Sequence, residues 1–317
     1  MKVLITDYAW PSVEPERSIL AGAGAEVVVV ETAGEDELAQ LAVDADGILT
    51  CWKPVTEKVI RAAENCVSIG RYGIGLDNID VDCATRLGIV VTNVPAYCVE
   101  EVSEHALALL LTLARKTAVY DRSIKAGMYN LQAGGPLYRV RGKTLGIVGL
   151  GRIGRRLAEK ACCLGLRTIA FDPNLSAADV EGSGVELVSF PALLASSDYI
   201  SIHVPLTDAT RRLFDAGAFR QMKPTAFLIN SSRGSVIDES ALLEALDEGR
   251  LAGTGLDVLD REPPAPFDPL TSHPKSVVTP HAAFSSQESL LELQTTAATQ
   301  MAEILLGKRP RNIVNPA

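Results

Sequence analysis

The chain is poor in several residue types and sequence features, and each shortage argues against a class of protein. Aromatic residues make up 5% of its 317 residues, and it has only four histidines, four methionines and two tryptophans. No apolar run approaches the roughly 20 residues that a bilayer-spanning helix needs. The 30 lysines and arginines form no long run and the net charge is −9, so a phosphate backbone would be repelled on average. We therefore expect neither a membrane nor a nucleic acid as a partner.

Cysteine is also scarce, and its spacing argues against a disulfide framework or a metal site. The six cysteines, at positions 51, 66, 83, 98, 162 and 163, include no Cys-x-x-Cys pair. We predict reduced, structural thiols in a cytoplasmic protein that binds no metal. The first seven residues contain one lysine and a short apolar stretch that ends at Asp7, which predicts a β-strand rather than a signal peptide.

Short β-branched runs alternate with helical patterns along most of the chain, which is typical of parallel α/β folds. The predicted strands of the first half are Val3–Thr6, Glu26–Val30, Gly47–Thr50, Val67–Gly70 and Ile89–Thr92, with helices near 14–22, 36–42, 56–63 and 80–87. Those of the second half are Leu145–Gly149, Thr168–Asp172, Val185–Val188, Tyr199–His203, Ala226–Asn230, Thr254–Asp257 and Val277–Thr279. The pattern predicts two doubly wound units. It leaves open whether they are consecutive or one is inserted in the other.

A long apolar helix is predicted between these two sets of strands. Beyond its acidic first turn, the segment from Val99 to Lys116 is apolar nearly all round. Such a helix must be buried between layers, domains or subunits. An irregular segment, 127–142, follows it, and a final helix is predicted at about 287–306.

A glycine-rich motif follows the predicted strand Leu145–Gly149. It consists of Gly149, Gly151 and Gly154, with Arg152 and Ile153 between the last two glycines, and a helical run starts at 155. In a dinucleotide fingerprint the first glycine permits a tight turn, the second lets the backbone approach a pyrophosphate, and the third lets the helix pack on the strand. The helix N-terminus then presents free N–H groups to the phosphates. The motif with this context predicts a dinucleotide site.

Asp172 ends the next predicted strand, 23 residues after Gly149. A carboxylate at this position accepts hydrogen bonds from ribose hydroxyls and repels a 2′-phosphate. The residues that follow, from Pro173 to Leu175, include no arginine that could neutralise such a phosphate. We therefore predict NAD rather than NADP, although Asp172 could instead cap a turn before Pro173.

Three chemically capable side chains follow strands of the second half. Arg233 follows the strand ending at Asn230, Glu262 follows the strand ending at Asp257, and His281 follows the strand ending at Thr279. Arginine matches a carboxylate with two parallel hydrogen bonds, and histidine exchanges a proton near neutral pH. A neighbouring glutamate stabilises the imidazolium. Reduction of a 2-oxo acid needs these three groups. Alternatively, Glu262 could cap its loop and Arg233 could form a surface ion pair.

Of the three other histidines, His203 competes with His281 for the acid/base role. His203 ends a predicted strand before Pro205 and has no evident carboxylate partner, so we expect it to line the cofactor site or to be structural. His105 lies on the apolar helix and His273 precedes Pro274 in a loop, and neither has a chemical partner visible in the sequence.

Taken together, these segments resemble the D-isomer-specific 2-hydroxyacid dehydrogenases. The resemblance covers the chain from about residue 47 and rests on segments 71–80, 93–95, 149–154, 203–206, 232–234, 256–258, 262–263 and 280–281. It is strongest for the branch of C-terminal-binding-protein corepressors and phosphoglycerate dehydrogenases, through segments 172–176 and 280–289. The corepressors often have tryptophan where Phe284 stands, and they carry disordered tails that we do not expect here. We also expect no regulatory domain after Asn312.

The resemblance implies a fold and a domain organisation. It implies two doubly wound α/β domains, a flavodoxin-like substrate-binding domain of residues 1–97 and 287–317 and an inserted Rossmann NAD domain of residues 98–286. It further implies an active site in the cleft between the domains and a homodimer formed through the 99–142 region.

The resemblance also implies residue roles. Arg233 would bind the carboxylate and carbonyl of the substrate, and His281, paired with Glu262, would be the acid/base. Asp257 would orient the nicotinamide amide, while Pro205 and Ser231 would line the cofactor site. The main-chain N–H groups of Ile74 and Gly75 would bind the substrate carboxylate from the other domain.

The expected activity is NAD-dependent interconversion of a small anionic 2-oxo acid and its D-2-hydroxy acid. Lys53 and Arg71 would suit a substrate with a second anionic group, but either could equally be a surface residue. Two alternatives stay open at this stage. One is an NAD(H)-sensing binding protein that works through a partner, and the other is a family member that oxidises phosphite or formate.

Overall fold

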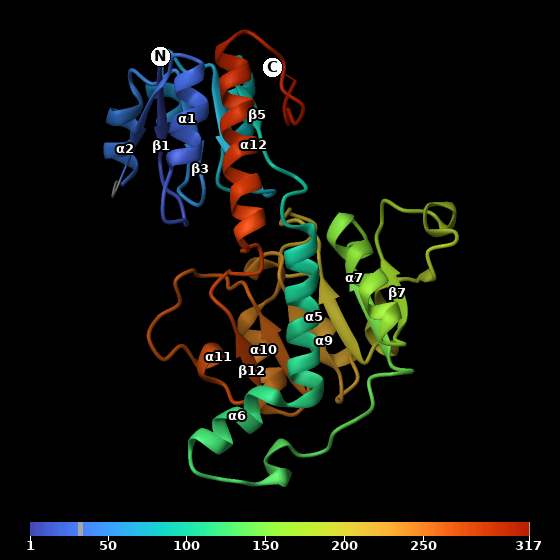
Figure 1. The fold of residues 1–317 in the computed structure, drawn as a ribbon. Helices are drawn as coiled ribbons and strands as arrows, with labels where there is room; N and C mark the ends of the chain where they lie inside the picture. The colour runs from blue at the N-terminus through green and yellow to red at the C-terminus, as the bar shows by residue number, and fades with distance from the viewer. Residues whose placement is uncertain (31–33, 317) are drawn as a thin grey trace. The chain divides into compact units, whose positions relative to one another are not determined.

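The protein consists of two compact units, and the second lies within the first in chain order. The computed structural model describes residues 1–30 and 34–316 (Figure 1). The first unit comprises Met1–Tyr97 and Ser285–Ala317, and the second comprises Cys98–Phe284. The chain therefore leaves the first unit after Tyr97 and returns to it at Ser285, which decides the question of consecutive or inserted units in favour of insertion.

The first unit is built on a five-stranded parallel sheet in the order β2-β1-β3-β4-β5, the flavodoxin-like order. Its strands are β1 (Lys2–Ile5), β2 (Glu26–Val29), β3 (Gly47–Thr50), β4 (Ser68–Arg71) and β5 (Val90–Thr92). Its helices are α1 (Glu14–Gly22), α2 (Glu35–Ala42), α3 (Glu57–Ala62), α4 (Val81–Arg86) and α12 (Gln287–Leu305). Apolar side chains of α2, α3 and α4 form one core with the strands.

The C-terminal segment completes the first unit. In Figure 1, α12 (red) lies beside α1, and it packs on β3 and β4. A Cβ atom on Gly47 would lie 2.4 Å from the sulfur of Met301, so the absence of a side chain at Gly47 makes room for the helix. Beyond α12, Ile313 pairs antiparallel with Thr92, at the open edge of β5. The last residues thus extend the sheet that the first residues begin.

The second unit contains a seven-stranded parallel sheet in the order β12-β11-β10-β9-β6-β7-β8, which is the Rossmann order. Its strands are β6 (Thr144–Val148), β7 (Arg167–Phe171), β8 (Val185–Leu187), β9 (Tyr199–Ile202), β10 (Phe227–Asn230), β11 (Gly253–Leu256) and β12 (Ser276–Val278). Each of the twelve predicted strands is present, with bounds that differ by a residue or so. For example, β7 ends at Phe171, so Asp172 is the first residue after the strand rather than its last.

Helices cover both faces of this sheet. They are α5 (Val99–Arg115), α6 (Thr117–Lys125), α7 (Arg152–Cys163), α8 (Phe190–Ser196), α9 (Ala216–Gln221), α10 (Glu239–Asp247) and α11 (Pro269–Ser272), with short 3-10 turns η1 (Leu131–Gly134), η2 (Ala177–Val180) and η3 (Gly234–Val236). Helices α5 and α7 share one core with the strands, and α8, α9 and α10 share the other. The long predicted helix is therefore buried against the sheet along one side. It ends at Arg115 because Lys116 adopts a left-handed conformation with φ of 57°.

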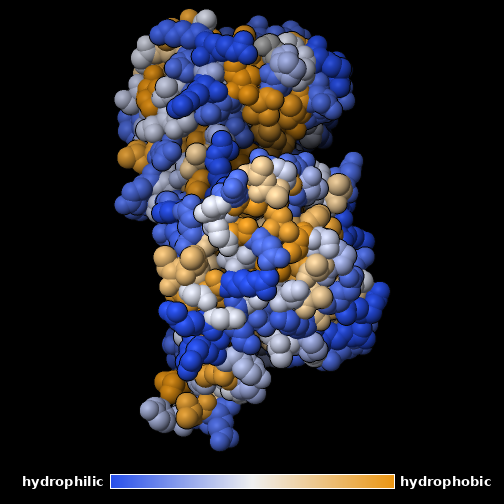
Figure 2. Space-filling view, turned by 90° about the vertical axis from the view of Figure 1, so that its right-hand side faces the viewer, coloured by the Kyte–Doolittle hydropathy of each residue, from blue (hydrophilic) through white to orange (hydrophobic). Residues whose placement is uncertain are grey.

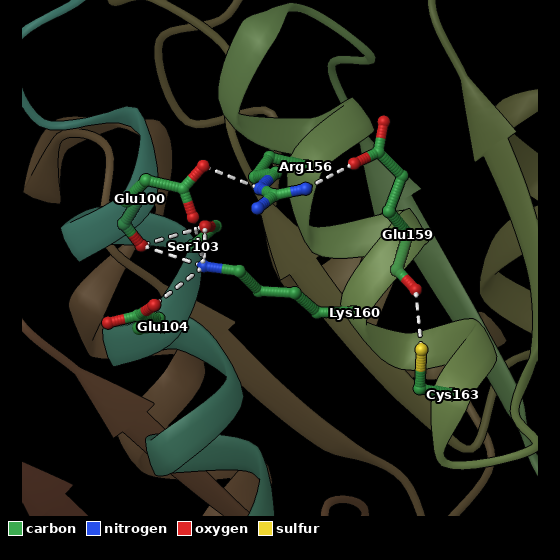
Figure 3. A network of polar contacts seen from close by, with 7 residues as sticks. All are labelled: Glu100, Ser103, Glu104, Arg156, Glu159, Lys160 and Cys163. Carbon is green, nitrogen blue, oxygen red and sulfur yellow. Dashed lines mark hydrogen bonds and ion pairs between the residues drawn. The ribbon is translucent and has the colours of Figure 1, made fainter.

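A polar network on the surface joins α5 to α7 (Figure 3). The ammonium of Lys160 on α7 lies 2.9 Å from the hydroxyl of Ser103, 2.9 Å from the carboxylate of Glu100 and 3.1 Å from that of Glu104, all on α5. The Arg156 guanidinium contacts the Glu100 carboxylate at 2.6 Å. Because α7 begins at the glycine-rich loop, this network fixes the helix whose N-terminus faces the predicted dinucleotide site.

Asn315 offers a test of how the C-terminal segment is attached. Its buried side chain accepts a hydrogen bond from the Val91 N–H at 2.7 Å and donates to the Ile89 carbonyl at 2.9 Å. Asn315→Leu should destabilise the first unit by about 1–3 kcal/mol, because a buried N–H loses its partner. Amide hydrogen exchange at Val91 should accelerate, with exchange at Ile229 of the second unit unchanged. Asn65→Leu, at an exposed position, is the control, and unchanged exchange at Val91 in Asn315→Leu would contradict the attachment.

Candidate functional site

The glycine-rich loop connects β6 to α7 at the point where the strand order of the second sheet reverses. Gly149 has φ of 91°, and a Cβ atom there would lie 2.8 Å from the backbone of His203. A Cβ atom on Gly154 would lie 2.3 Å from the carbonyl oxygen of Gly149, so strand and helix approach each other closely. Nothing lies within 4 Å of a Cβ atom built on Gly151, the residue that precedes the helix. The space above Gly151 is therefore open, as approach of a pyrophosphate requires.

Asp172 is fixed beside this loop by two backbone hydrogen bonds. Its carboxylate accepts from the N–H of Leu150 at 3.0 Å and from the N–H of Asn174 at 3.0 Å. The first bond ties the carboxylate to the glycine-rich loop, and the second forms the turn that the sequence suggested as an alternative. Both interpretations are therefore compatible with the structure. The remaining lone pairs of a carboxylate can accept ribose hydroxyls.

His203 and Ser231 lie at the ends of the central strands β9 and β10. The His203 Nε2 atom is 2.8 Å from the hydroxyl of Ser201, and burial lowers the pKa of His203 to about 4. His203 is therefore neutral at physiological pH, so it has no imidazolium proton to give. The Ser231 hydroxyl is buried, and among the described residues it has no hydrogen-bond partner. A buried hydroxyl without a partner suits a site that a polar ligand completes. Pro205, after His203, is exposed.

Arg233 is presented by a turn that the buried side chain of Asn230 organises. The Asn230 oxygen accepts from the N–H and the hydroxyl of Ser232, and its amide donates to the Arg233 carbonyl at 2.9 Å. Asn230 was not identified from the sequence as a residue that shapes the Arg233 turn. The available signal was its position, since a polar residue at the end of a buried strand needs hydrogen-bond partners.

His281 and Glu262 are in direct contact, although they follow different strands. The His281 Nδ1 atom lies 2.6 Å from one oxygen of the Glu262 carboxylate. The other oxygen accepts from the N–H of Leu259 at 2.9 Å, so the carboxylate is fixed on both sides. His281 has φ of 51°, a left-handed conformation that few non-glycine residues adopt. The aromatic ring of Phe284 lies near the imidazole, edge-on to it with a centroid distance of 6.3 Å.

The charge of Glu262 is set by opposing effects. Burial by itself raises the pKa of Glu262. The hydrogen bond and charge of His281 and the hydrogen bond from Leu259 lower it, and the nearby charge of Arg233 lowers it further. The lowering effects dominate, so the pKa of Glu262 lies below its usual value and the group is a carboxylate at neutral pH. The charge effects also show that the structure brings Arg233, Glu262 and His281 together.

Asp257, predicted to orient the cofactor, is buried under the turn that carries His281. Its carbonyl accepts the His281 N–H at 2.8 Å, and its carboxylate accepts the N–H groups of Ala282 and Ala283 at 2.9 Å each. The hydroxyl of Thr279 donates to the same carboxylate at 2.5 Å. His105 contacts Thr279 at 2.8 Å, so this histidine has a partner that was not visible in the sequence. The partner follows residue 105 by 174 positions, which is why sequence inspection missed it.

His273 also has partners that the sequence did not reveal. Its Nδ1 atom accepts the N–H of Lys275 at 3.1 Å, and its Nε2 atom lies 3.3 Å from the carboxylate of Asp247. These contacts stabilise the turn before β12.

Among residues 1–30 and 34–316, no cluster of His, Cys, Asp or Glu suitable for a metal ion occurs.

The predicted substrate-binding residues of the first unit lie on two segments that Asn78 ties together, one after β3 and one that begins at the end of β4. The Asn78 amide donates to the carbonyl of Lys53 at 3.1 Å, and its oxygen accepts from the Arg71 Nε at 3.1 Å. The Arg71 side chain is buried and folds back on the Tyr72 carbonyl. Arg71 is therefore not the surface residue that the sequence left open as an alternative.

The other two substrate-binding candidates lie on the loop that follows β4 and Arg71. The Ile74 carbonyl accepts from the Asn93 amide at 2.8 Å, and Ile74 and Gly75 are half-buried. In contrast to Arg71, the Lys53 ammonium is buried without a hydrogen-bond partner among the described residues.

Residues 107–283 match the model of the NAD-binding domain of the D-isomer-specific 2-hydroxyacid dehydrogenases. The chain belongs to this family. Its second unit is therefore the family's NAD-binding domain, and the open space over Gly151, the fixed Asp172 carboxylate and the buried Ser231 hydroxyl fit that cofactor.

Curated relatives and solved structures agree with this assignment. The chain is 39% identical over 316 residues to a D-3-phosphoglycerate dehydrogenase of Archaeoglobus fulgidus, covering 99% of this chain but 59% of that protein. It is 41% identical over 267 residues to a glyoxylate reductase of Korarchaeum cryptofilum, covering 83% of this chain and 80% of that one. A D-lactate dehydrogenase of Aquifex aeolicus, solved with NAD and lactic acid, superposes with a TM-score of 0.89 at 27% identity, covering 99% and 100% of the two chains.

These relatives place the chain in the phosphoglycerate dehydrogenase-like branch of the family. The likeness to C-terminal-binding-protein corepressors stays a prediction.

No helix among the described residues of this family member is long and apolar enough to cross a membrane.

Two glycine substitutions should separate cofactor binding from folding. A Cβ atom at position 151 would contact no protein atom, and Gly151 has φ of −75°, so Gly151→Ala should retain stability. Because the added methyl group would occupy the space that the pyrophosphate needs, affinity for NADH should fall about tenfold or more, a loss of about 1.4 kcal/mol. Gly154→Ala should instead destabilise the second unit, because its Cβ atom would lie 2.3 Å from a carbonyl oxygen. NADH fluorescence titration and thermal unfolding measure the two effects. Unchanged NADH affinity in Gly151→Ala would argue against a pyrophosphate at this loop.

Glu262→Gln tests the predicted acid/base role of His281. The substitution removes the negative charge beside the imidazole, so it disfavours the imidazolium form, which is the predicted proton donor. We expect the alkaline limb of the pH profile for 2-oxo acid reduction to move toward acid by about one pH unit or more. The profile of kcat/KM against pH measures this shift, and Glu159→Gln, on the exposed surface of α7, is the control. An identical profile would mean that Glu262 is not the functional partner of His281.

Proposed function

We propose that this protein is an NAD-dependent oxidoreductase that interconverts a small 2-oxo acid and its D-2-hydroxy acid. The observation that carries the proposal is the contact of His281 with a charged Glu262, close to Arg233, in the same unit as the dinucleotide loop. The matched relatives that are named phosphoglycerate dehydrogenase and glyoxylate reductase support it.

Each of the three residues has a distinct task in this reaction. Arg233 binds the carboxylate and the carbonyl oxygen of the 2-oxo acid with its planar guanidinium. Glu262 engages Nδ1 of His281, so Nε2 is the atom that exchanges the proton with the substrate oxygen. In the direction of reduction the carbonyl carbon gains a hydride and the oxygen gains the His281 proton. In oxidation Nε2 takes that proton back. The bound nicotinamide supplies or accepts the hydride.

The two units divide the remaining work in this proposal. Residues 98–286 bind the cofactor through the glycine loop with Arg152 and Ile153, through Asp172 and through His203, Pro205, Ser231 and Asp257. Residues 1–97 and 287–317 bind the substrate, with Lys53, Arg71, Ile74 and Gly75 as the candidate contacts.

The six cysteines are all free and four are buried, which supports a cytoplasmic location.

A panel assay identifies the substrate and tests the alternatives. NADH consumption is followed with glyoxylate, hydroxypyruvate, pyruvate, phosphohydroxypyruvate and 2-oxoglutarate, and NAD reduction with phosphite and formate. Turnover of a 2-oxo acid is the expected result. Tight NADH binding without turnover of any compound would favour the NAD(H)-sensing protein, and activity with phosphite or formate would replace the 2-oxo acid.

His281 should be essential to this turnover. We expect His281→Asn to lower kcat by roughly 10²–10⁴-fold with NADH affinity largely retained, because general acid–base catalysis contributes that much. His273→Asn is the matched control, since His273 contacts Asp247 and Lys275 rather than the site. Equal activities of the two variants would remove His281 from the mechanism.

We further propose that the chain forms a homodimer through the 99–142 region. Large apolar side chains are exposed on α6 and on the segment that follows it, and orange residues are visible on the projecting segment at the bottom of Figure 2. Tyr129 is 98% exposed and Leu131 is 83% exposed. Such a cluster is uncommon on the surface of a monomer and typical of an interface.

Light scattering with size-exclusion chromatography tests the homodimer. The unmodified protein should have twice the mass of the chain, and the double variant Tyr129→Asp/Leu131→Asp should have the mass of one chain, because an interface core excludes unpaired charges. Val43→Asp, at a half-exposed position of the first unit, is the control and should stay dimeric. A monomeric unmodified protein, or a dimeric double variant, would contradict the proposal.

A further inference from the structure

A chain of three side chains connects α5 to the turn that carries His281. The His105 Nε2 atom lies 2.8 Å from the Thr279 hydroxyl oxygen and 3.4 Å from a carboxylate oxygen of Asp257. The Thr279 hydroxyl lies 2.5 Å from the same carboxylate oxygen. The Asp257 side chain is buried, whereas about a quarter of the His105 side chain is exposed. His105 is thus the outermost member of a largely buried polar chain.

The direction of each hydrogen bond in this chain follows from proton counting. A carboxylate only accepts, so the Thr279 hydroxyl must donate its one hydrogen to Asp257. The same hydroxyl can then only accept from His105, which requires a hydrogen on Nε2. The 3.4 Å approach of Nε2 to the Asp257 carboxylate agrees with that assignment. The geometry therefore selects the Nε2–H form of His105.

Asp257 transmits this orientation to the backbone of the catalytic turn. Its carboxylate accepts from the N–H groups of Ala282 and Ala283, and its carbonyl accepts from the N–H of His281. His281 is in a left-handed conformation that is unfavourable for a residue other than glycine, so surrounding contacts must maintain it. Three consecutive N–H groups bonded to one aspartate provide these contacts.

We propose that His105 is a positioning residue for the dehydrogenase reaction. By donating to Thr279 it fixes the Asp257 carboxylate, and through that carboxylate it fixes the turn that orients the His281 imidazole. This inference rests on the proposed role of His281. It adds a residue on α5, a helix that the sequence marks only as an apolar packing element, to the groups that determine the reaction rate.

Three kinetic variants test the role of the donor. His105→Leu removes it, His105→Gln replaces it with an amide N–H at a similar distance from the backbone, and Thr279→Val removes the hydroxyl with little change of shape. We expect kcat to fall about tenfold in His105→Leu and in Thr279→Val, equivalent to about 1.4 kcal/mol, and to recover to within about threefold of the unmodified enzyme in His105→Gln. The KM for NADH should change less than twofold. The deuterium isotope effect on kcat with deuterated NADH should increase as hydride transfer becomes limiting.

A double-mutant cycle separates this chain from two independent packing effects. Combining His105→Leu with Thr279→Val should cost little more than either substitution alone, because both break the same chain. Additive losses would overturn the proposal. So would a His105→Gln variant as slow as His105→Leu, or slow variants whose loss of activity follows their loss of thermal stability.

Two measurements without turnover decide the inference even if the proposed reaction is wrong. Nitrogen NMR of the unmodified protein with labelled histidine should show a hydrogen on Nε2 of His105, and a hydrogen on Nδ1 alone would overturn the inference. Amide hydrogen exchange at Ala282 and Ala283 should accelerate about tenfold in His105→Leu and return to the original rate in His105→Gln, since tenfold corresponds to about 1.4 kcal/mol of opening free energy. Unchanged exchange in His105→Leu would also overturn it. His273→Leu is the matched control and should leave both amides unaffected.

Discussion

Parallel strand pairing in the second unit is the constraint on which the candidate site depends. Strands β6, β9, β10, β11 and β12 all run in one direction, so the segments that follow them meet at one edge of the sheet. The glycine loop, the Arg233 turn and the His281 turn are three of those segments. Arg233 and His281 are 48 residues apart in the chain, and the glycine loop lies further from both. Without parallel pairing Glu262 could not be 2.6 Å from His281, because the two residues leave from different strands.

The two carboxylates of the site are used in different ways. The Asp257 carboxylate is buried and accepts two backbone N–H groups, and it organises the backbone of the turn. The Glu262 carboxylate is half-buried and contacts the His281 ring directly, so it acts on charge and ring orientation. One turn is therefore controlled at its backbone and at its side chain by separate acidic residues. This arrangement suits a histidine that must keep one ring orientation while it exchanges a proton.

The first unit depends on contacts between the two ends of the chain. The sheet begins at Lys2, and helix α12 and the segment ending at Asn315 pack on and extend that same sheet. Folding of this unit therefore requires residues that are separated by the whole second unit. Non-local contacts of this kind have a high loop-closure cost, which a compact inserted unit reduces by keeping its two ends together.

The sequence by itself determined the α/β class, the twelve strands and the glycine loop, and it singled out Arg233, Glu262 and His281 as candidates, because hydrophobic periodicity and the residues that follow strands are local signals. The strand pattern left the order of the two units open and only the family resemblance implied an insertion, which the tertiary structure shows. Only the tertiary structure decided that Arg71 is buried and that His105 has a partner. Those facts depend on contacts such as His105 with Thr279 or Asn315 with Val91, whose members are far apart in the chain. No local pattern records such pairs, because they follow from how strands and helices pack.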